Sequence, residues 1–170
     1  MIEANILEKF EKIKLLILDV DGILTDGRII FSPQGDEFKV FNVKDGVAIK
    51  NLMKNNIDVA IISGRKSPAV THRMQELGVQ YIFLGQNDKL AAYQNIKNTL
   101  HLEDHQIACM GDDLPDLTIM QPCGLSITVA DAVDEVKAVA DFISTRNGGD
   151  AAVREVSDLL LKVQQSKVAA

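Results

Sequence analysis

Four separate segments of the chain hold side chains that suit phosphoryl transfer. An aspartate pair, Asp19 and Asp21, directly follows the apolar run LLIL. Further along lie a hydroxyl at Ser63, an ammonium at Lys89 and a carboxylate at Asp112. Carboxylates hold Mg²⁺, an aspartate can attack phosphorus as a nucleophile, and Ser and Lys side chains hold phosphate oxygens. Together these residue types indicate phosphoryl transfer that uses magnesium.

These side chains can act together only if the fold brings them to one place. Short apolar runs predict strands buried on both faces of a parallel sheet. The runs are 15–19, 58–64, 79–85, 106–112, 125–129 and 141–145. Helical patterns alternate with them at 45–56, 89–102 and 151–163. This alternation predicts a doubly wound, mostly parallel, Rossmann-like α/β fold. Ligands bind at the carboxyl ends of the strands in such sheets, so the four segments should share one rim.

The segment 27–43 interrupts the alternation. Two partly apolar runs are joined there by Ser-Pro-Gln-Gly, which predicts a β-hairpin that projects from the sheet after the first strand. Its apolar residues are Ile29, Ile30, Phe31, Phe38, Val40 and Phe41. Exposed apolar edges aggregate unless they are paired. We therefore expect the hairpins to associate around a symmetry axis in a closed homo-oligomer.

Length and charge narrow the class of protein further. The 170 residues predict a single domain over 1–170. The net charge of −6 argues against nucleic acid and anionic membranes as partners. No apolar run approaches the roughly 20 residues of a membrane span, and the first residues lack a signal-peptide pattern. The two cysteines form no C-x-x-C pattern, which favours reduced thiols and a cytoplasmic location.

Four ordered motifs resemble those of the haloacid dehalogenase superfamily. They are DVDG at 19–22, ISGR at 62–65, Asp88-Lys89 and GDDLPD at 111–116. The resemblance covers nearly the whole chain. It implies that Asp19 is the nucleophile, forming an aspartyl-phosphate. It also implies that Asp21 protonates the leaving oxygen and then deprotonates the attacking water.

The same resemblance implies a metal site and a phosphate site. Mg²⁺ would be bound by Asp19, the backbone carbonyl of Asp21, and Asp112. The supporting residues would be Asp113 and Asp116, and the phosphoryl group would be held by Ser63 and Lys89. Taken alone, these residues also have ordinary structural interpretations: Asp113 as a helix N-cap, Asp116 as a first-turn acid and Lys89 as a solvated lysine.

Members of this superfamily usually carry a cap domain, and this chain has no room for one. This chain is similar to the 3-deoxy-D-manno-octulosonate 8-phosphate phosphatases in three features. It is short, it has a hairpin after the first motif, and it contains TRNGGDAAVREV at 145–156. Those enzymes serve lipopolysaccharide synthesis and are typically tetramers. Related enzymes act on nonulosonate 9-phosphates, which remain an alternative substrate class.

The resemblance implies a small sugar-acid phosphate as substrate. Its expected contacts beyond the catalytic residues are Asn42, Val43, Lys44, Asp45, Gly46, Lys50, Gly64, Arg65 and Arg73. The guanidinium groups of Arg65 and Arg73 suit the substrate carboxylate. The family has Arg where Lys50 stands, so the bidentate fork is lost there. We also hypothesise that the C-terminal tail, about 148–170, reaches a neighbouring active site.

A signalling module resembling a receiver domain is the alternative from another class. Such modules also gather acidic residues on an α/β sheet, with Thr and Lys nearby. They place the phosphorylated aspartate on a later strand, whereas Asp21 here stands two residues from Asp19 and favours rapid turnover. A binding protein with a decayed active site is disfavoured, because no motif position is missing.

Overall fold

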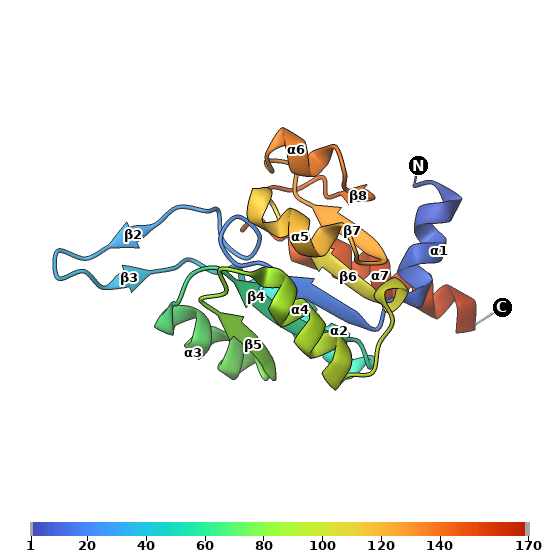
Figure 1. Ribbon diagram of the computed structural model, residues 1–170, viewed down its shortest axis with the longest axis horizontal. Helices are drawn as coiled ribbons and strands as arrows, with labels where there is room; N and C mark the ends of the chain where they lie inside the picture. Colours follow the sequence, from blue (N-terminus) through green and yellow to red (C-terminus); the bar gives the residue numbers. More distant parts are fainter. Residues whose placement is uncertain (1, 169–170) are drawn as a thin grey trace.

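Six parallel strands form the central sheet of the molecule (Figure 1), and the computed structural model describes residues 2–168. The strands are β1 (Leu15–Leu18), β4 (Asp58–Ser63), β5 (Tyr81–Leu84), β6 (Ile107–Met110), β7 (Leu125–Thr128) and β8 (Phe142–Ile143). Their spatial order is β5-β4-β1-β6-β7-β8. The predicted doubly wound fold is confirmed, and each predicted apolar run contains one of these strands. The strand order reverses direction between β1 and β6, where such sheets bind ligands.

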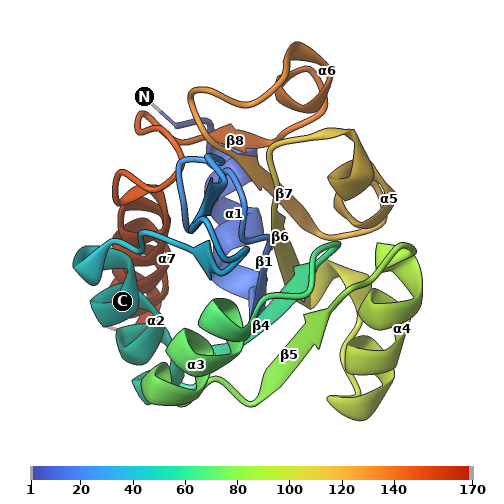
Figure 2. The ribbon, with the colours of Figure 1, turned by 90° about the vertical axis from the view of Figure 1, so that its left-hand side faces the viewer.

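Helices cover both faces of the sheet (Figure 2). One face carries α2 (Val43–Lys54), α3 (Pro68–Leu77) and α7 (Ala152–Val168), and α1 (Ala4–Lys12) packs against α7. The other face carries α4 (Lys89–Thr99) and α5 (Leu117–Met120), while α6 (Asp134–Lys137) lies at the β8 end. Within residues 2–168, no helix combines the length and apolar character that a membrane crossing requires.

Several predicted helix boundaries were wrong by a few residues, most of all at the end of α7, which continues to Val168 rather than ending at residue 163. α2 begins at Val43 rather than residue 45, because the Asn42 side chain accepts a hydrogen bond from the Lys44 N–H and caps the helix there. α4 ends at Thr99 rather than residue 102. His101 has a φ of 51°, in the left-handed region that ends right-handed helices.

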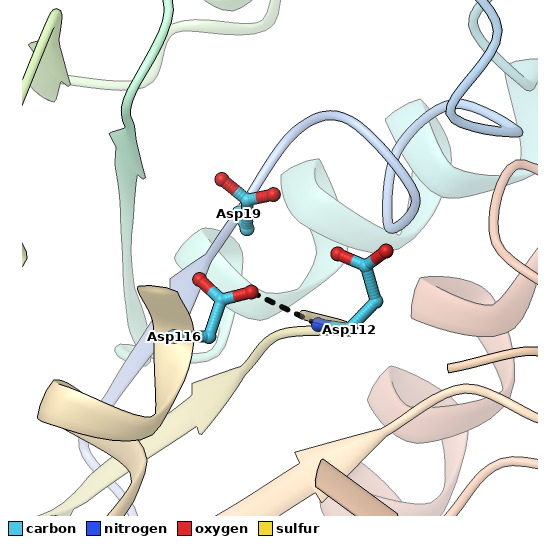
Figure 3. A group of neighbouring side chains, drawn as sticks. All are labelled: Asp19, Asp112 and Asp116. Atoms are coloured by element: carbon cyan, nitrogen blue, oxygen red, sulfur yellow. Dashed lines mark hydrogen bonds between the residues drawn. The ribbon is translucent and has the colours of Figure 1, made fainter. Parts of the chain in front are cut away.

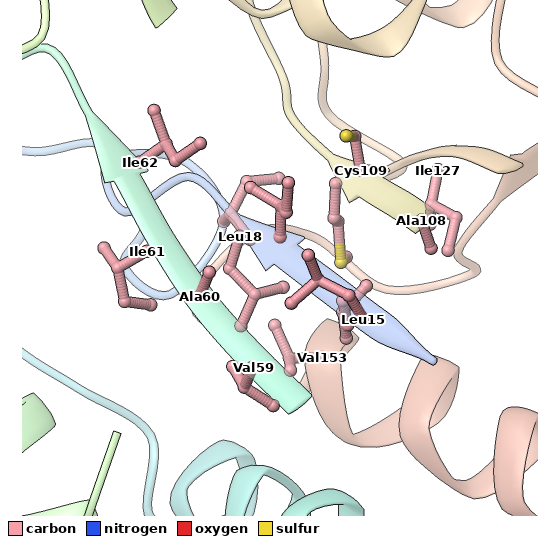
Figure 4. Packing of buried hydrophobic residues seen from close by; sticks show 14 of the residues in the cluster. Leu15, Leu18, Val59, Ala60, Ile61, Ile62, Ala108, Cys109, Ile127 and Val153 are labelled. Atoms are coloured by element: carbon pink, nitrogen blue, oxygen red, sulfur yellow. The ribbon is translucent and has the colours of Figure 1, made fainter. Parts of the chain in front are cut away.

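The core lies on both sides of β1, the central strand. All four residues of β1 have no exposed surface. Figure 4 shows β1, with Leu15 and Leu18, between β4, with Val59 and Ile61, and β6, with Ala108 and Cys109. Burial on both faces explains why the sequence of β1 is a continuous apolar run rather than an alternating one.

The predicted hairpin is present and projects away from the sheet (Figure 1). It contains β2 (Ile30–Phe31) and β3 (Glu37–Phe38), which pair antiparallel, with Ile30 opposite Phe38. The side chains of Phe31, Phe38 and Val40 are 58%, 55% and 70% exposed. The hairpin therefore presents apolar surface that the described residues of its own chain leave uncovered.

The C-terminal segment is anchored to its own chain. The N–H of Gly149 donates to the carbonyl of Ile23 at 3.0 Å, and its carbonyl accepts from the Asn42 side chain at 3.1 Å. From Ala152 onward the chain forms α7, which packs against α1 and α2. The described part of the tail, residues 148–168, therefore braces the loop after Asp21 of its own chain, and its reach to a neighbouring active site stays a prediction. Residues 169–170 of that tail lie outside the described range.

Candidate active site

Asp19 stands directly after β1, at the point where the strand order reverses. Its backbone N–H donates to the Met110 carbonyl at 3.0 Å, which continues the β1–β6 pairing. The Lys89 ammonium, from the first turn of α4, donates to Asp19 Oδ1 at 2.8 Å and to Asp116 Oδ1 at 2.5 Å. The side chains of Lys89, Asp19 and Asp116 are 5%, 10% and 3% exposed. Lys89 is therefore not a solvated lysine but the buried link between two carboxylates.

Asp116 is fixed by its backbone surroundings as well as by Lys89. Its Oδ2 accepts hydrogen bonds from the N–H groups of Asp112 and Asp113, at 3.0 and 3.2 Å. Gly111 makes room for this side chain, because a Cβ at that position would overlap the Asp116 carboxyl group. The Asp113 side chain accepts from the Leu114 N–H and caps the short helix, the ordinary role suggested by the sequence. Asp116 thus shapes the loop that carries Asp112.

Figure 3 shows Asp19, Asp112 and Asp116 gathered at the ends of β1 and β6. One carboxylate oxygen from each lies within 4.8 Å of the others. Gly22, with a φ of +90°, lets the backbone after Asp21 pass against Asp112, whose carboxylate would overlap any Cβ there. Asp112 therefore stands beside the loop that follows the nucleophile.

The crowded carboxylates raise one another's pKa. Burial and the charge of Asp116 raise the pKa of Asp19 to about 6, although Lys89 acts against this rise. Burial and the charges of Asp19, Asp116 and Asp113 raise the pKa of Asp112 to about 7. Burial acts to lower the pKa of Lys89, but the charges of Asp19 and Asp116 outweigh it and the pKa is raised. The cluster thus carries negative charge that one lysine does not fully balance.

A divalent cation fits this cluster. Carboxylate oxygens are the ligands that Mg²⁺ prefers, and Asp19 and Asp112 offer theirs at the open rim of the sheet. Asp116 lies equally near, but its Oδ1 is bound to Lys89 and its Oδ2 to two backbone N–H groups. Asp116 therefore suits the predicted role of a support, whereas Asp19 and Asp112 suit that of ligands. The Asp21 carbonyl stays a predicted ligand.

The loop after β4 brings the predicted phosphate-binding hydroxyl to the same edge. Ser63 is the last residue of β4, which pairs with β1, and its side chain is buried. Its Oγ accepts a hydrogen bond from the Arg65 N–H at 3.4 Å, so Ser63 also stabilises the turn at Gly64. The Arg65 side chain, 44% exposed, reaches Glu37 of β3 at 2.5 Å. The predicted phosphate contacts therefore follow successive strands on one side of β1: Ser63 ends β4, and Lys89 begins α4 after β5.

Asp21 has a partner that sequence reasoning missed. Its Oδ1 lies 2.5 Å from the ammonium of Lys39, which also lies 3.3 Å from Glu37. The period of two along a strand places Glu37 and Lys39 on one face of the hairpin stem and the exposed Phe38 and Val40 on the other. That alternation was the available signal, but it does not reveal that the polar face turns toward Asp21.

Two predicted substrate contacts, Asp45 and Arg73, also have structural partners within the chain. Asp45 is buried, and its Oδ1 accepts from the Arg154 N–H of α7 at 2.9 Å. Its Oδ2 is buried with no hydrogen-bond partner, and burial raises the pKa of this carboxyl to about 6. Arg73 lies against Gly46 and pairs with Glu76. Asp45 therefore joins α2 to α7 rather than facing the rim, while Arg73 lies beside the start of α2.

The remaining predicted contacts lie on or beside the surface of α2. Val43, Lys44 and Lys50 are exposed, and these stay predicted contacts. All three histidines, His72, His101 and His105, are exposed. The two cysteines carry free thiols, and Cys109 is buried within β6.

The fold and this site define a haloacid dehalogenase-like hydrolase. The family model described by that name matches residues 82–156, which include Lys89 and the GDDLPD segment. The chain is 44% identical over 163 residues to the 3-deoxy-D-manno-octulosonate 8-phosphate phosphatase KdsC of Escherichia coli, covering 96% of this chain and 87% of that protein. The corresponding KdsC of Yersinia pestis is 43% identical over 160 residues, covering 94% of this chain and 86% of that protein. This chain belongs to the 3-deoxy-D-manno-octulosonate 8-phosphate phosphatase family.

Solved structures agree with that membership. A crystal structure of the Yersinia pestis phosphatase superposes with a TM-score of 0.94 at 42% identity, covering 95% of this chain and 88% of that one. The Moraxella catarrhalis phosphatase, solved with magnesium, phosphate and KDO, superposes with a TM-score of 0.93 at 43% identity. That match covers 98% of this chain and 97% of the other. These relatives are phosphatases, so the receiver-like interpretation is not carried forward.

Proposed function

We propose that this protein hydrolyses 3-deoxy-D-manno-octulosonate 8-phosphate to the free sugar acid and inorganic phosphate. The observation that carries the proposal is the buried Lys89 ammonium between Asp19 and Asp116, beside Asp112 at the switch point of the sheet. The phosphatases of Escherichia coli and Yersinia pestis, named for this substrate, support the choice of sugar. The reaction is a step of lipopolysaccharide synthesis.

The proposed reaction has two displacements at phosphorus. In the first, an Asp19 carboxylate oxygen bonds to phosphorus, the ester P–O bond breaks, and the leaving oxygen takes a proton from Asp21. In the second, water gives a proton to Asp21 and bonds to phosphorus, while the bond to Asp19 breaks. The balance is one phosphomonoester and one water giving one alcohol and one phosphate.

The surrounding residues prepare this chemistry. Lys89 holds Asp19 in place before substrate arrives and offers positive charge to the phosphoryl oxygens. Ser63 offers a hydroxyl donor from the neighbouring strand. When bound by Asp19, Asp112 and the Asp21 carbonyl, Mg²⁺ would neutralise charge on the phosphoryl oxygens and on these carboxylates. The sugar-acid carboxylate would be bound by Arg65 and Arg73.

A substrate panel tests the proposal. Purified protein with Mg²⁺ is given the octulosonate 8-phosphate, a nonulosonate 9-phosphate and p-nitrophenyl phosphate, and released phosphate is measured. We expect kcat/KM to be at least about tenfold higher for the octulosonate than for the nonulosonate, equal to about 1.4 kcal/mol. A higher kcat/KM for the nonulosonate 9-phosphate would make that ester the proposed substrate. Release of no phosphate from any of the three esters would reject the proposed phosphatase activity.

We also propose that the active form is a homotetramer built through the hairpins. The support is the apolar face of the hairpin, where Phe31, Phe38 and Val40 are each more than half exposed. A neighbouring subunit would then supply the cover that a cap domain supplies in other hydrolases of this class. The cytoplasmic location stays a prediction, and the unpaired thiols of both cysteines agree with it.

A further inference from the structure

The polar face of the hairpin stem makes a charge network with the active-site loops. Lys39 lies 2.5 Å from Asp21 Oδ1 and 3.3 Å from Glu37 Oε1. Glu37 Oε2 accepts from Arg65 at 2.5 Å. Arg65 in turn lies 3.7 Å from Asp21 Oδ2. Four charged side chains from three segments, two positive and two negative, therefore form a closed ring beside Asp19.

The burial of Lys39 separates it from an ordinary hairpin lysine. Its side chain is 1% exposed, although Phe38 and Val40 on either side of it are more than half exposed. Holding a long, flexible lysine side chain in one position costs side-chain entropy, and a single exposed ion pair rarely offsets this cost. Lys39 is instead held from two sides, by Glu37 and Asp21.

Glu37 is the centre of this network. Its side chain is 11% exposed, and burial alone would raise its pKa. Hydrogen bonding to Arg65 and the charge of Lys39 reverse this and lower the pKa to about 2. Glu37 therefore stays charged across the physiological pH range, and it holds both cations in position.

The geometry points to Lys39 as a positioning residue of the active site, which holds Oδ1 of Asp21 and leaves Oδ2 as the unheld oxygen of this carboxyl group. The 2.5 Å contact of Lys39 fixes one oxygen, whereas the 3.7 Å distance from Arg65 to the other exceeds a hydrogen bond. Without Lys39, the Asp21 side chain would lose its orientation toward the ester oxygen. This inference rests on the proposed phosphatase activity and adds a role that the four motifs do not contain.

Leaving-group chemistry separates positioning from simple anchoring of the hairpin. An alkyl phosphate expels a strongly basic alkoxide, which needs the proton from Asp21, whereas p-nitrophenolate leaves without one. The quantity to compare is kcat/KM, because it reports the steps up to departure of the first leaving group. If Lys39 positions Asp21, its loss affects alkyl phosphates selectively.

The experiment measures kcat/KM of wild type and Lys39→Met for the octulosonate 8-phosphate, glycerol 2-phosphate and p-nitrophenyl phosphate. We expect losses of about 10- to 100-fold for the two alkyl phosphates and of less than about threefold for the aryl phosphate. Lys39→Arg, which keeps the charge, should recover the alkyl activity to within about fivefold. Glu37→Gln should show the same selectivity with a smaller loss, about 3- to 10-fold.

The matched control is Arg28→Met, which removes a cation from the segment that leads into β2. Arg28 is 84% exposed and pairs only locally, with Asp26. Its loss should change no substrate by more than about twofold. Light scattering on each variant checks that the oligomeric state equals that of wild type.

The outcomes separate this inference from the proposed function. Equal losses for alkyl and aryl phosphates, or none beyond the Arg28→Met control, would show that Lys39 only anchors the hairpin and would overturn the inference. If the protein hydrolyses glycerol 2-phosphate but not the octulosonate 8-phosphate, the proposed substrate is rejected. The comparison of glycerol 2-phosphate with p-nitrophenyl phosphate would still decide the role of Lys39. A wild-type protein inactive on all three esters would overturn both.

Discussion

The carboxylate cluster and the β2–β3 hairpin are neighbours in the chain but are stabilised in opposite ways. In the cluster, Asp19, Lys89 and Asp116 are almost fully covered, and each has partners within the same chain. The hairpin pairs only two residues per strand and exposes apolar side chains over most of its length. The first region can form in a single chain, whereas the second has apolar surface that a partner would cover.

In this hydrolase without a cap domain, the residues that carry out the chemistry and the residues that would select the substrate lie in different regions. Asp19 continues the pairing of the buried central strand, and Lys89 bonds to it, so both are fixed to the packed core. The parts that would select a sugar and exclude water are on the hairpin and on exposed loops. Glu37 and Lys39 join the two regions, since they belong to the hairpin and contact the active-site loops.

The strongest test of the cluster is Asp19→Asn. We expect kcat for phosphate release to fall at least about a thousandfold, because the amide cannot attack phosphorus. Asp58→Asn, at the amino end of the neighbouring β4, removes a carboxylate far from the rim and should leave kcat within about twofold. Activity of Asp19→Asn comparable to wild type would show that another group is the nucleophile.

Lys89→Met tests whether the cluster depends on its internal cation. Asp19 and Asp116 would keep buried charges without a cationic partner, so we expect the free energy of unfolding to fall by about 3 kcal/mol. Added Mg²⁺ should raise the melting temperature of this variant more than that of wild type. Lys97→Met on the same helix breaks the partly exposed pair with Asp104 and should cost about 1 kcal/mol or less. Equal losses for the two variants would contradict a special role for Lys89.

Asp45, at the point where the hairpin returns to the body, predicts a pH dependence of stability. Its folded-state pKa of about 6 lies above the ordinary 3.8, so the stability linked to its proton is present below about pH 4 and lost as pH rises through 6. Asp45→Asn cannot ionise, so its stability relative to wild type should rise between pH 4 and 7, by up to about 3 kcal/mol. Urea unfolding across this range measures the difference. If the difference in the free energy of unfolding between the variant and wild type does not change with pH, burial does not raise the pKa of Asp45.

Val40→Asp tests whether the hairpin is the interface between subunits. Of these variants it should have the smallest effect on the stability of the separated chain. We expect light scattering to show dissociation of the oligomer and kcat/KM for the sugar phosphate to fall about tenfold, because the site loses its cover. Stability of the separated chain should change by less than about 0.5 kcal/mol, since Val40 is 70% exposed. Val139→Asp, an exposed valine after α6, is the matched control and should leave the assembly intact. A Val40→Asp protein with unchanged mass would reject the hairpin as the interface.

Local patterns in the sequence were sufficient to predict the sheet and to place the active-site side chains at its rim. The apolar run before Asp19 predicts β1, and the alternation of strands and helices predicts the rim that Asp19, Lys89 and Asp112 share. What the period of a segment does not encode is which distant loop it meets. Lys39 has the pattern of a solvent-facing strand lysine, yet it is covered because the hairpin stem folds back on Asp21.

Asp45 shows the same limit in the opposite direction. It stands in the segment that resembles a substrate-binding stretch, but α7, more than a hundred residues later, covers it and donates an N–H to it. The loop at Gly148 and Gly149 is another case. Its glycines suggest mobility, whereas a Cβ at either position would overlap the backbone of residues 22–26. Close packing between distant segments, rather than flexibility, requires glycine there.

This close packing also sets the order in which the protein becomes active during synthesis. The chain leaves the ribosome from its N-terminus, at about 5 to 20 residues per second, so all six strands emerge before residues 148–154. Only then can Gly149 bond to Ile23 and brace the loop that carries Asp21. A nascent chain can therefore hold the complete set of strands and still lack a catalytic loop in its final conformation. The last segment of the fold is therefore needed to complete the conformation of the loop that carries Asp21.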